Sequence, residues 1–220
     1  METLYESTAL LSSTYFGPVQ WYQKLNRYKR CVIERFDNYT KQTYRNRCVI
    51  VTANGVQALT VPTKSYDTPK YPMRDIRISD HGEWRHLHWN AITSAYGESP
   101  FFDYYADDLR PFFEKHWEYL FDFNLEITHT MCDLLDIRPT IALSDEYAIL
   151  PSASESPGTV QERQHVADFR DVIRPKHPQP DPDFVPRTYY QVYASRHGFL
   201  PNLSILDLLF NEGPEGVFYL

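Results

Sequence analysis

A chain of 220 residues with 42% hydrophobic and 23% charged side chains can bury one good core, and this composition is typical of a soluble globular protein. The formal net charge of -7 argues against a nucleic-acid partner, because nucleic-acid binding depends on a basic face that neutralises phosphates. The sequence contains no apolar run of membrane-spanning length and does not begin like a signal peptide, so we expect a cytoplasmic protein without a membrane span.

The first predicted elements form a βαβ unit, in which strand, turn, helix and strand occupy residues 8–12, 13–18, 19–28 and 31–33. Val19, Tyr22 and Leu25 recur at helical spacing, and the short apolar runs on either side are typical of strands. A connection of this kind makes the two strands parallel. The turn has no glycine-rich nucleotide fingerprint, so by itself it favours a structural role over anion binding at the helix N-terminus.

A basic connection follows the second strand. Residues 38–47 carry three cations and no carboxylate, and they lie between the strand runs 31–33 and 48–52. In an open α/β sheet, connections at the strand ends are where ligands bind, and guanidinium groups match carboxylate or phosphate geometry. One interpretation is therefore an anion site at the same sheet edge as the first turn. The alternative is a solvated loop whose cations pair with nearby acids.

The anion-site interpretation assigns roles within this connection. Arg45 and Arg47 alternate along the chain, so we expect only one of them to point inward. The amides of Gln42 and Asn46 suit the hydroxyls of a sugar or ribose. The strands after it, over residues 48–52 and 57–61, flank an Asn-Gly pair that predicts a hairpin.

A helical block occupies residues 81–137, with helices predicted over 84–96, 101–105, 112–121 and 125–137. His81, His86 and His88 do not have the spacing of metal ligands on one helix face, so we expect no metal site. His88 shares a stripe with Ile92 and Tyr96 and is either a core residue or, if it opens onto a cleft, a general base. Ser99 is either a nucleophile activated by His88 or, more in keeping with the following proline, a helix cap.

Half of the sixteen prolines lie in residues 138–187, which predicts an extended segment between a core of residues 1–137 and a C-terminal arm of residues 188–220. The arm is expected to pack on the core as a strand over 188–194 and a helix that Asn202 caps and Gly213 ends.

Several of these motifs together resemble the WbqC-like protein family. They are the Tyr15-Phe16-Gly17-Pro18 turn, the basic run ending Tyr44-Arg45-Asn46-Arg47, Asn54-Gly55 before Leu59-Thr60-Val61-Pro62, the spaced Trp84, His88, Tyr96 and Ser99-Pro100-Phe101, and residues 203–214. The resemblance implies a place in bacterial gene clusters for surface polysaccharide such as O-antigen, and transfer of a glycyl or similar acyl group onto a sugar. It gives no settled mechanism and no cofactor.

We therefore predict an α/β protein: a small Rossmann-like, mostly parallel sheet with a β-hairpin, a helical subdomain and an extended C-terminal arm. The predicted function is an acyl- or aminoacyl-type transferase that acts on a sugar-linked or activated carboxylate substrate. His88 is the expected general base, and the expected substrate-binding residues are Tyr15, Tyr39, Lys41, Gln42, Arg45, Asn46, Arg47, Tyr96 and Ser99. The alternative is a non-catalytic scaffold that docks a partner enzyme, with a homodimer formed through the arm.

Overall fold

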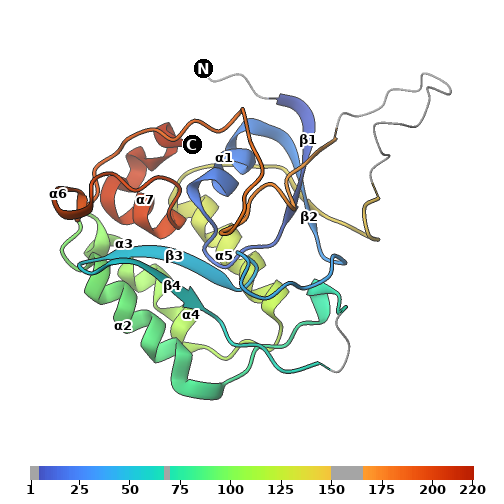
Figure 1. Ribbon diagram of the computed structural model, residues 1–220, viewed down its shortest axis with the longest axis horizontal. Helices are drawn as coiled ribbons and strands as arrows, with labels where there is room; N and C mark the ends of the chain where they lie inside the picture. The colour runs from blue at the N-terminus through green and yellow to red at the C-terminus, as the bar shows by residue number, and fades with distance from the viewer. Residues whose placement is uncertain (1–4, 67–69, 150–165) are drawn as a thin grey trace.

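The computed structural model describes residues 5–66, 70–149 and 166–220, and it confirms the predicted α/β class (Figure 1). Its main sheet has the strand order β5-β2-β1-β6, and every neighbouring pair in it is parallel. The strands are β1 (Tyr5–Ser12), β2 (Tyr28–Glu34), β5 (Ile141–Leu143) and β6 (Val166–Asp168). Helix α1 (Val19–Arg27) connects β1 to β2, as the βαβ pattern predicted.

The two outer strands of this sheet come from the proline-rich segment. β5 pairs with β2, and β6 pairs with the opposite edge of β1. The predicted boundary at residue 137 therefore separates strands that belong to one sheet. The segment is also fixed to the core farther along, because Asp181 lies 2.8 Å from Lys24 Nζ on α1 and both side chains are buried. Residues 152–158 of the predicted linker lie outside the described residues.

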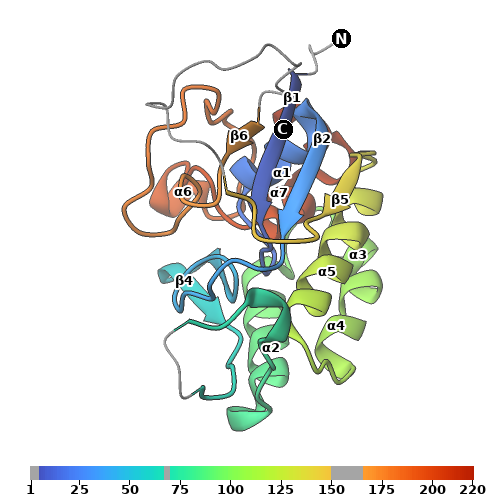
Figure 2. The ribbon, with the colours of Figure 1, turned by 90° about the vertical axis from the view of Figure 1, so that its right-hand side faces the viewer.

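The Asn-Gly hairpin is confirmed and forms a separate two-stranded sheet of β3 (Arg47–Thr52) and β4 (Gly55–Thr60). Gly55 takes a φ of +107°, which glycine adopts readily and other residues avoid. Figure 2 shows the carboxyl ends of β1 and β2 pointing toward the part of the molecule that holds β4 and α2. The carboxyl edge of the main sheet therefore faces the hairpin and the helical block.

The helical block holds the 3₁₀ turns η1 (Met73–Asp75) and η2 (His81–Glu83) and the helices α2 (Trp84–Tyr96), α3 (Phe102–Leu109), α4 (Pro111–Glu114) and α5 (Leu120–Leu134). The predicted helix over residues 112–121 is wrong. The backbone becomes extended at Lys115, and the Glu118 carbonyl accepts a hydrogen bond from Ile78 N. This pairing with a distant segment overrides the helical pattern locally, which propensity alone does not reveal.

The C-terminal arm contains α6 (Ala194–His197), α7 (Ile205–Glu212) and η3 (Gly213–Tyr219). No strand forms over residues 188–194, because the backbone there bonds to side chains: Tyr190 N to Glu212 and Val192 N to Asn211. Ser204, not Asn202, caps α7, since its hydroxyl accepts from Leu206 N. Gly213 ends α7 as predicted.

Helix α7 is a core element, and Leu206, Leu208 and Phe210 have no exposed surface. The cysteines Cys31, Cys48 and Cys132 are free and buried. Within the described ranges, none of the helices has both the length and the apolar character needed to cross a membrane.

Candidate functional site

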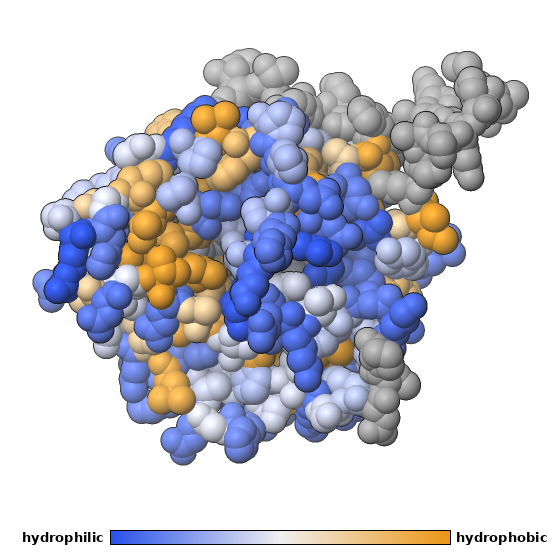
Figure 3. Space-filling model, in the orientation of Figure 1, coloured by the Kyte–Doolittle hydropathy of each residue, from blue (hydrophilic) through white to orange (hydrophobic). Residues whose placement is uncertain are grey.

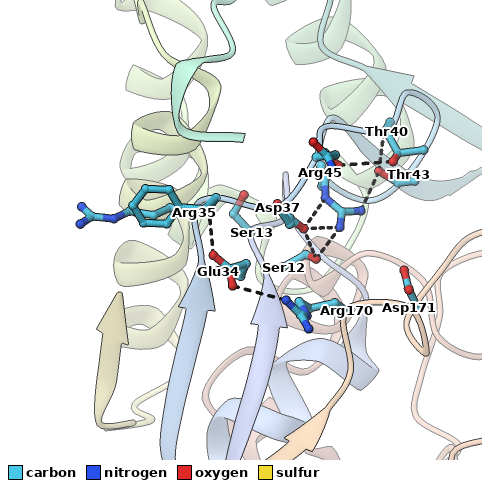
Figure 4. Close-up of polar contacts among 12 residues, drawn as sticks. Ser12, Ser13, Glu34, Arg35, Asp37, Thr40, Thr43, Arg45, Arg170 and Asp171 are labelled. Atoms are coloured by element: carbon cyan, nitrogen blue, oxygen red, sulfur yellow. Dashed lines mark hydrogen bonds and ion pairs between the residues drawn. The ribbon is translucent and has the colours of Figure 1, made fainter. Parts of the chain in front are cut away.

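Polar side chains gather at the carboxyl edge of the parallel sheet, where the strand ends meet (Figure 4). Ser12 ends β1, Glu34 ends β2, Ser144 follows β5 and Asp168 ends β6. In open α/β sheets, ligands bind beyond these strand ends. They bind in the crevice at the point where the strand order reverses. Here that point lies between β1 and β6, because the chain leaves β1 through α1 toward β2 and returns later on the other side.

Asp37, Arg45 and Ser12 form the first group at this edge, which we call the Asp37 cluster. Asp37 Oδ2 accepts hydrogen bonds from Ser12 Oγ at 3.0 Å and from Arg45 Nε at 3.1 Å, and it also contacts Arg45 Nη2. Arg45 Nη2 donates to Ser12 Oγ at 2.7 Å. All three side chains are buried. The second carboxylate oxygen, Asp37 Oδ1, is buried too and has no hydrogen-bond partner among the residues that the structure describes.

Glu34, Ser144 and Arg170 form the second group, the Glu34 cluster. Glu34 Oε1 accepts from Ser144 Oγ at 2.7 Å and from Phe36 N at 2.9 Å. Its other oxygen accepts from Ala148 N at 2.8 Å and from Arg170 Nη1 at 3.3 Å. Both oxygens of this fully buried carboxylate are therefore satisfied by the protein, which is the pattern of a structural ion pair.

The basic connection and the first turn do meet. Tyr15 N donates to the Tyr44 carbonyl at 2.9 Å, and Asn124 Nδ2 of α5 donates to the Arg45 carbonyl at 2.8 Å. The first helix does not offer its N-terminus to an anion, however. The Leu203 carbonyl accepts from Val19 N, and Asn202 Oδ1 accepts from Gln20 N. The C-terminal arm therefore satisfies the N–H groups that an anion would use.

The cations of the basic connection take different positions. Arg45 points inward as expected for one of the two arginines, but it faces Asp37 and is not a free anion-binding group. Arg47 is partly exposed and donates to Thr60 Oγ1 at 3.0 Å across the hairpin. Lys41 and Gln42 are exposed, and Asn46 is buried with its amide on the Val61 carbonyl. The structure thus fits the alternative reading for Arg45, a cation paired with a nearby acid.

His88 lies in an aromatic layer with Tyr15 and Trp84. Its Nδ1 is 2.9 Å from the Tyr15 hydroxyl, and its ring packs against Trp84 at a centroid distance of 5.1 Å. Burial lowers the pKa of His88 to about 4, although a hydrogen bond to the Thr60 backbone acts in the opposite direction. Of the two interpretations of His88, the structure therefore fits the core residue better than the general base, because the ring is buried and desolvated. This geometry favours a structural role for both His88 and Tyr15.

The remaining predicted residues do not join the Asp37 cluster. Tyr96 is fully buried against Phe210 of α7, and its hydroxyl accepts from Val51 N at 3.4 Å. Ser99 is buried in the turn after α2, and no side chain caps α3. Tyr39 is half-buried, with its hydroxyl 3.4 Å from Thr63 Oγ1. The structure therefore does not bring the predicted site residues together. Arg45 lies at the sheet edge, His88 and Tyr15 lie in the aromatic layer, Tyr96 packs on α7, and the others lie elsewhere along the chain.

The sequence did carry a signal for the residues that were missed. Glu34 follows a β-branched run directly and Asp37 comes three residues later, and polar groups at the carboxyl end of a buried parallel strand are typical of α/β sites. Arg170 had no such signal, because β6 has only three residues. In the part of the chain that the structure describes, no three His, Cys, Asp or Glu side chains are grouped to hold a metal ion.

Comparisons with known proteins agree with the motif resemblance. The family model described as the WbqC-like protein family matches residues 13–219. The chain is also similar to a protein of Mycobacterium tuberculosis (strain ATCC 25618 / H37Rv), "Uncharacterized protein Rv1507c", at 29% identity over 197 residues, which cover 83% of each chain. No solved structure matches this chain.

Proposed function

This chain belongs to the WbqC-like protein family, and we propose that it is an acyl- or aminoacyl-type transferase whose reaction takes place at the carboxyl edge of the parallel sheet. The substrate is a sugar-linked or activated carboxylate compound of bacterial surface-polysaccharide or metabolite biosynthesis. The position supports the proposal, because this edge is where open α/β sheets bind ligands. The Asp37 cluster supplies the chemistry, and the Glu34 cluster holds the strand ends in place.

One observation carries the proposal: among the residues that the structure describes, Asp37 Oδ1 has no hydrogen-bond partner. Leaving a buried acceptor without a hydrogen bond costs about 1–3 kcal/mol, and more for a charged group. Arg45 and Ser12 hold Asp37 Oδ2, so the carboxylate has a fixed orientation, while the buried Oδ1 keeps its acceptor capacity unused. An N–H or O–H group of a bound substrate would supply the missing partner.

In the proposed reaction, Asp37 acts as the general base. An amine or hydroxyl of the acceptor attacks the carbonyl carbon of the activated donor, and its nitrogen or oxygen forms the new bond to that carbon. The bond from the carbonyl carbon to the activating group breaks, and that group leaves with the electron pair. The proton of the attacking group passes to Asp37 Oδ1. A positioned base of this kind contributes typically a factor of about 10² to 10⁴ in rate.

Asp37→Asn tests this role. The amide oxygen still accepts from Arg45 and Ser12, but the side chain no longer takes a proton. We expect transfer to fall by about 100-fold or more, measured as product mass with amino sugars or their nucleotide conjugates as acceptors and aminoacyl or acyl thioesters as donors. The assay is run where circular dichroism shows that the variant is folded.

Two controls separate chemistry from stability. Asp145→Asn removes a fully exposed acid that follows β5 at the same edge, and it should leave transfer unchanged. Arg170→Gln weakens the fold through the Glu34 cluster and should retain transfer at temperatures where it is folded. Equal turnover by the wild type and Asp37→Asn would contradict the proposal.

Exposed apolar side chains favour a second candidate, the non-catalytic scaffold. Val185, Tyr190 and Phe218 are 73%, 56% and 68% exposed, and the Arg187 side chain contacts the Phe218 carbonyl. Size-exclusion chromatography of the wild type and of Val185→Gln/Phe218→Gln tests it. A dimer or complex that only the wild type forms, combined with no transfer activity, would favour the scaffold.

A further inference from the structure

A groove of about 550 Å³ lies between the proline-rich segment and the hairpin β3–β4. This volume is in the range of small-molecule sites. Figure 3 shows hydrophobic residues gathered on this face, in the area where Figure 1 places the hairpin and the segment leading to α7. The residues that line the groove are Gln20, Tyr44, Val49, Val56, Arg174, Pro175, Pro178, Gln179, Asp181, Phe184, Pro186, Leu200, Pro201, Asn202 and Leu203.

The groove begins beside the crevice of the sheet. Gln20 lies in the first turn of α1, directly after the β1 turn, and Arg174 follows the end of β6 by six residues. The strands β1 and β6 lie on the two sides of the crevice. Tyr44 lines the groove, while its neighbour Arg45 belongs to the Asp37 cluster. The groove and the Asp37 cluster therefore share the basic connection, which contributes one residue to each.

The wall formed by the proline-rich segment is fixed to the core. Asp181 Oδ2 is 2.8 Å from Lys24 Nζ and accepts from Gln20 Nε2 at 2.8 Å. Gln23 Nε2 donates to the Asp183 carbonyl at 3.2 Å. Breaking a buried ion pair is costly, so this wall is held in position before any ligand binds.

The chemistry of the lining points to one class of ligand. Most of the lining side chains are apolar, and Val56 remains 60% exposed. The lining has two charged side chains, Asp181 and Arg174. Asp181 is paired with the buried Lys24, whereas Arg174 has no buried acid as its partner in the described residues. Arg174 pairs through Nη2 with the exposed Asp171, and its Nε is buried with no hydrogen-bond partner in the described residues. An apolar body with a single anionic end fits these groups.

We propose that this groove binds the acyl chain of the donor, with the anionic end of the donor held by Arg174. The proposal rests on the transferase function and adds the donor class: a medium-length acyl group that carries a carboxylate or an activating phosphate. The usual nucleotide-phosphate position is closed, because Asn202 and Leu203 already cap α1. This argues for an acyl phosphate or related donor in preference to a nucleotide.

Isothermal titration of the full chain with octanoate, octanoyl phosphate, octanol and acetate tests the proposal. We expect octanoate and octanoyl phosphate to bind at one molecule per chain, and acetate and octanol to bind at least tenfold more weakly. Tighter binding of octanoyl phosphate identifies the activating phosphate as the group on Arg174, and tighter binding of octanoate identifies the carboxylate. Arg174→Gln should weaken the anions about tenfold and leave octanol unchanged.

Substitutions at exposed apolar positions provide the second arm. Val56→Asp places a carboxylate at the groove and should abolish octanoate binding, whereas Leu87→Asp, at a similarly exposed residue of α2, should not. Arg110→Gln is the matched control for the lost cation, because Arg110 is exposed and pairs with Glu114 on α4. Unchanged octanoate binding in both Arg174→Gln and Val56→Asp would overturn the proposal, as would dimerisation that occupies the groove and is lost in Val56→Asp.

Failure of this proposal is distinguishable from failure of the proposed function. Binding of octanoate needs no turnover, and Asp37→Asn should retain it. Octanoate binding without transfer to any acceptor would leave the groove assignment intact and contradict the transferase. If Asp37→Asn loses transfer activity while Arg174→Gln and Val56→Asp keep it, the transferase function would be supported and the groove assignment would be contradicted.

Discussion

Arg170, two residues past the end of β6, reaches across the end of β1 to Glu34 at the end of β2, with 3.3 Å between Nη1 and Oε2. Because β6 and β2 lie on opposite sides of β1, this pair joins strands that are not neighbours. The Arg170 guanidinium also binds both oxygens of Asp168, on its own side of the sheet. The carboxyl edge that carries the proposed site is therefore held together from both sides of its central strand.

Arg170→Met should lower the free energy of unfolding by about 3 kcal/mol, because it leaves the Glu34 charge buried without its partner. Urea denaturation measures the change. Arg138→Met is the control, since Arg138 is exposed and its acid partners are exposed too, and we expect an effect within about 0.5 kcal/mol. A loss below about 1 kcal/mol for Arg170→Met would mean that Ser144 and the backbone N–H groups satisfy Glu34 without it.

Arg45→Met should also destabilise the protein, by about 3–5 kcal/mol, because the buried Asp37 loses its counter-ion. Lys41→Met, at an exposed position of the same connection, should stay within about 0.5 kcal/mol of the wild type. Melting temperatures measured by circular dichroism at pH 7 compare the two. If both variants behave like the wild type, Arg45 is not a structural partner of Asp37.

His88 should make the protein less stable as the pH falls. Its pKa is about 4 in the folded chain against an ordinary value of 6.5, so between these values only the unfolded chain binds the proton. The free energy of unfolding should fall by up to about 3 kcal/mol for this group as the pH drops from 6.5 to 4. His88→Gln removes this dependence. Urea denaturation at pH 4.5, 5.5 and 6.5 should give a smaller decrease for the variant than for the wild type.

Asp207 should make the protein more stable as the pH falls, which is the opposite of the effect of His88. Burial raises the pKa of Asp207 to about 6, although hydrogen bonds from Tyr189, Gln191 and Tyr96 favour its charged form. Between pH 3.8 and 6 the folded chain holds a proton that the unfolded chain has lost. The contribution of this group to stability is therefore complete below pH 3.8 and is lost as the pH rises through 6.

Asp207→Asn should remove that contribution, of up to about 3 kcal/mol. The variant should lose more stability than the wild type between pH 6.5 and 4.5, because the His88 effect is then no longer offset. The same urea series on Asp207→Asn, His88→Gln and the double variant checks both signs. Parallel profiles for the wild type and Asp207→Asn would show that Asp207 does not titrate in this window.

Local patterns in the sequence determined much of the scaffold. The strand at residues 8–12, the helix after Pro18, the strand at 31–33, the Asn-Gly hairpin and the helix end at Gly213 were all predicted, and so was the family. Each depends on residues close together in the chain, whose periodicity or backbone conformation carries the information. The strands β5 and β6 escaped prediction because three residues show no period, and they form only through pairing with β2 and β1.

Only the tertiary structure decided which polar groups work together. The sequence predicted that only one of Arg45 and Arg47 points inward, but that this is Arg45, in contact with Asp37 and Ser12, depends on where β1 and β2 end. It gave His88 a stripe on α2, but the desolvation that lowers its pKa comes from Tyr15, Trp84 and other residues of the aromatic layer around it. Glu34 and Arg170 are 136 positions apart in the chain. Burial and charge pairing depend on such distant contacts, and no local pattern in a single sequence encodes them.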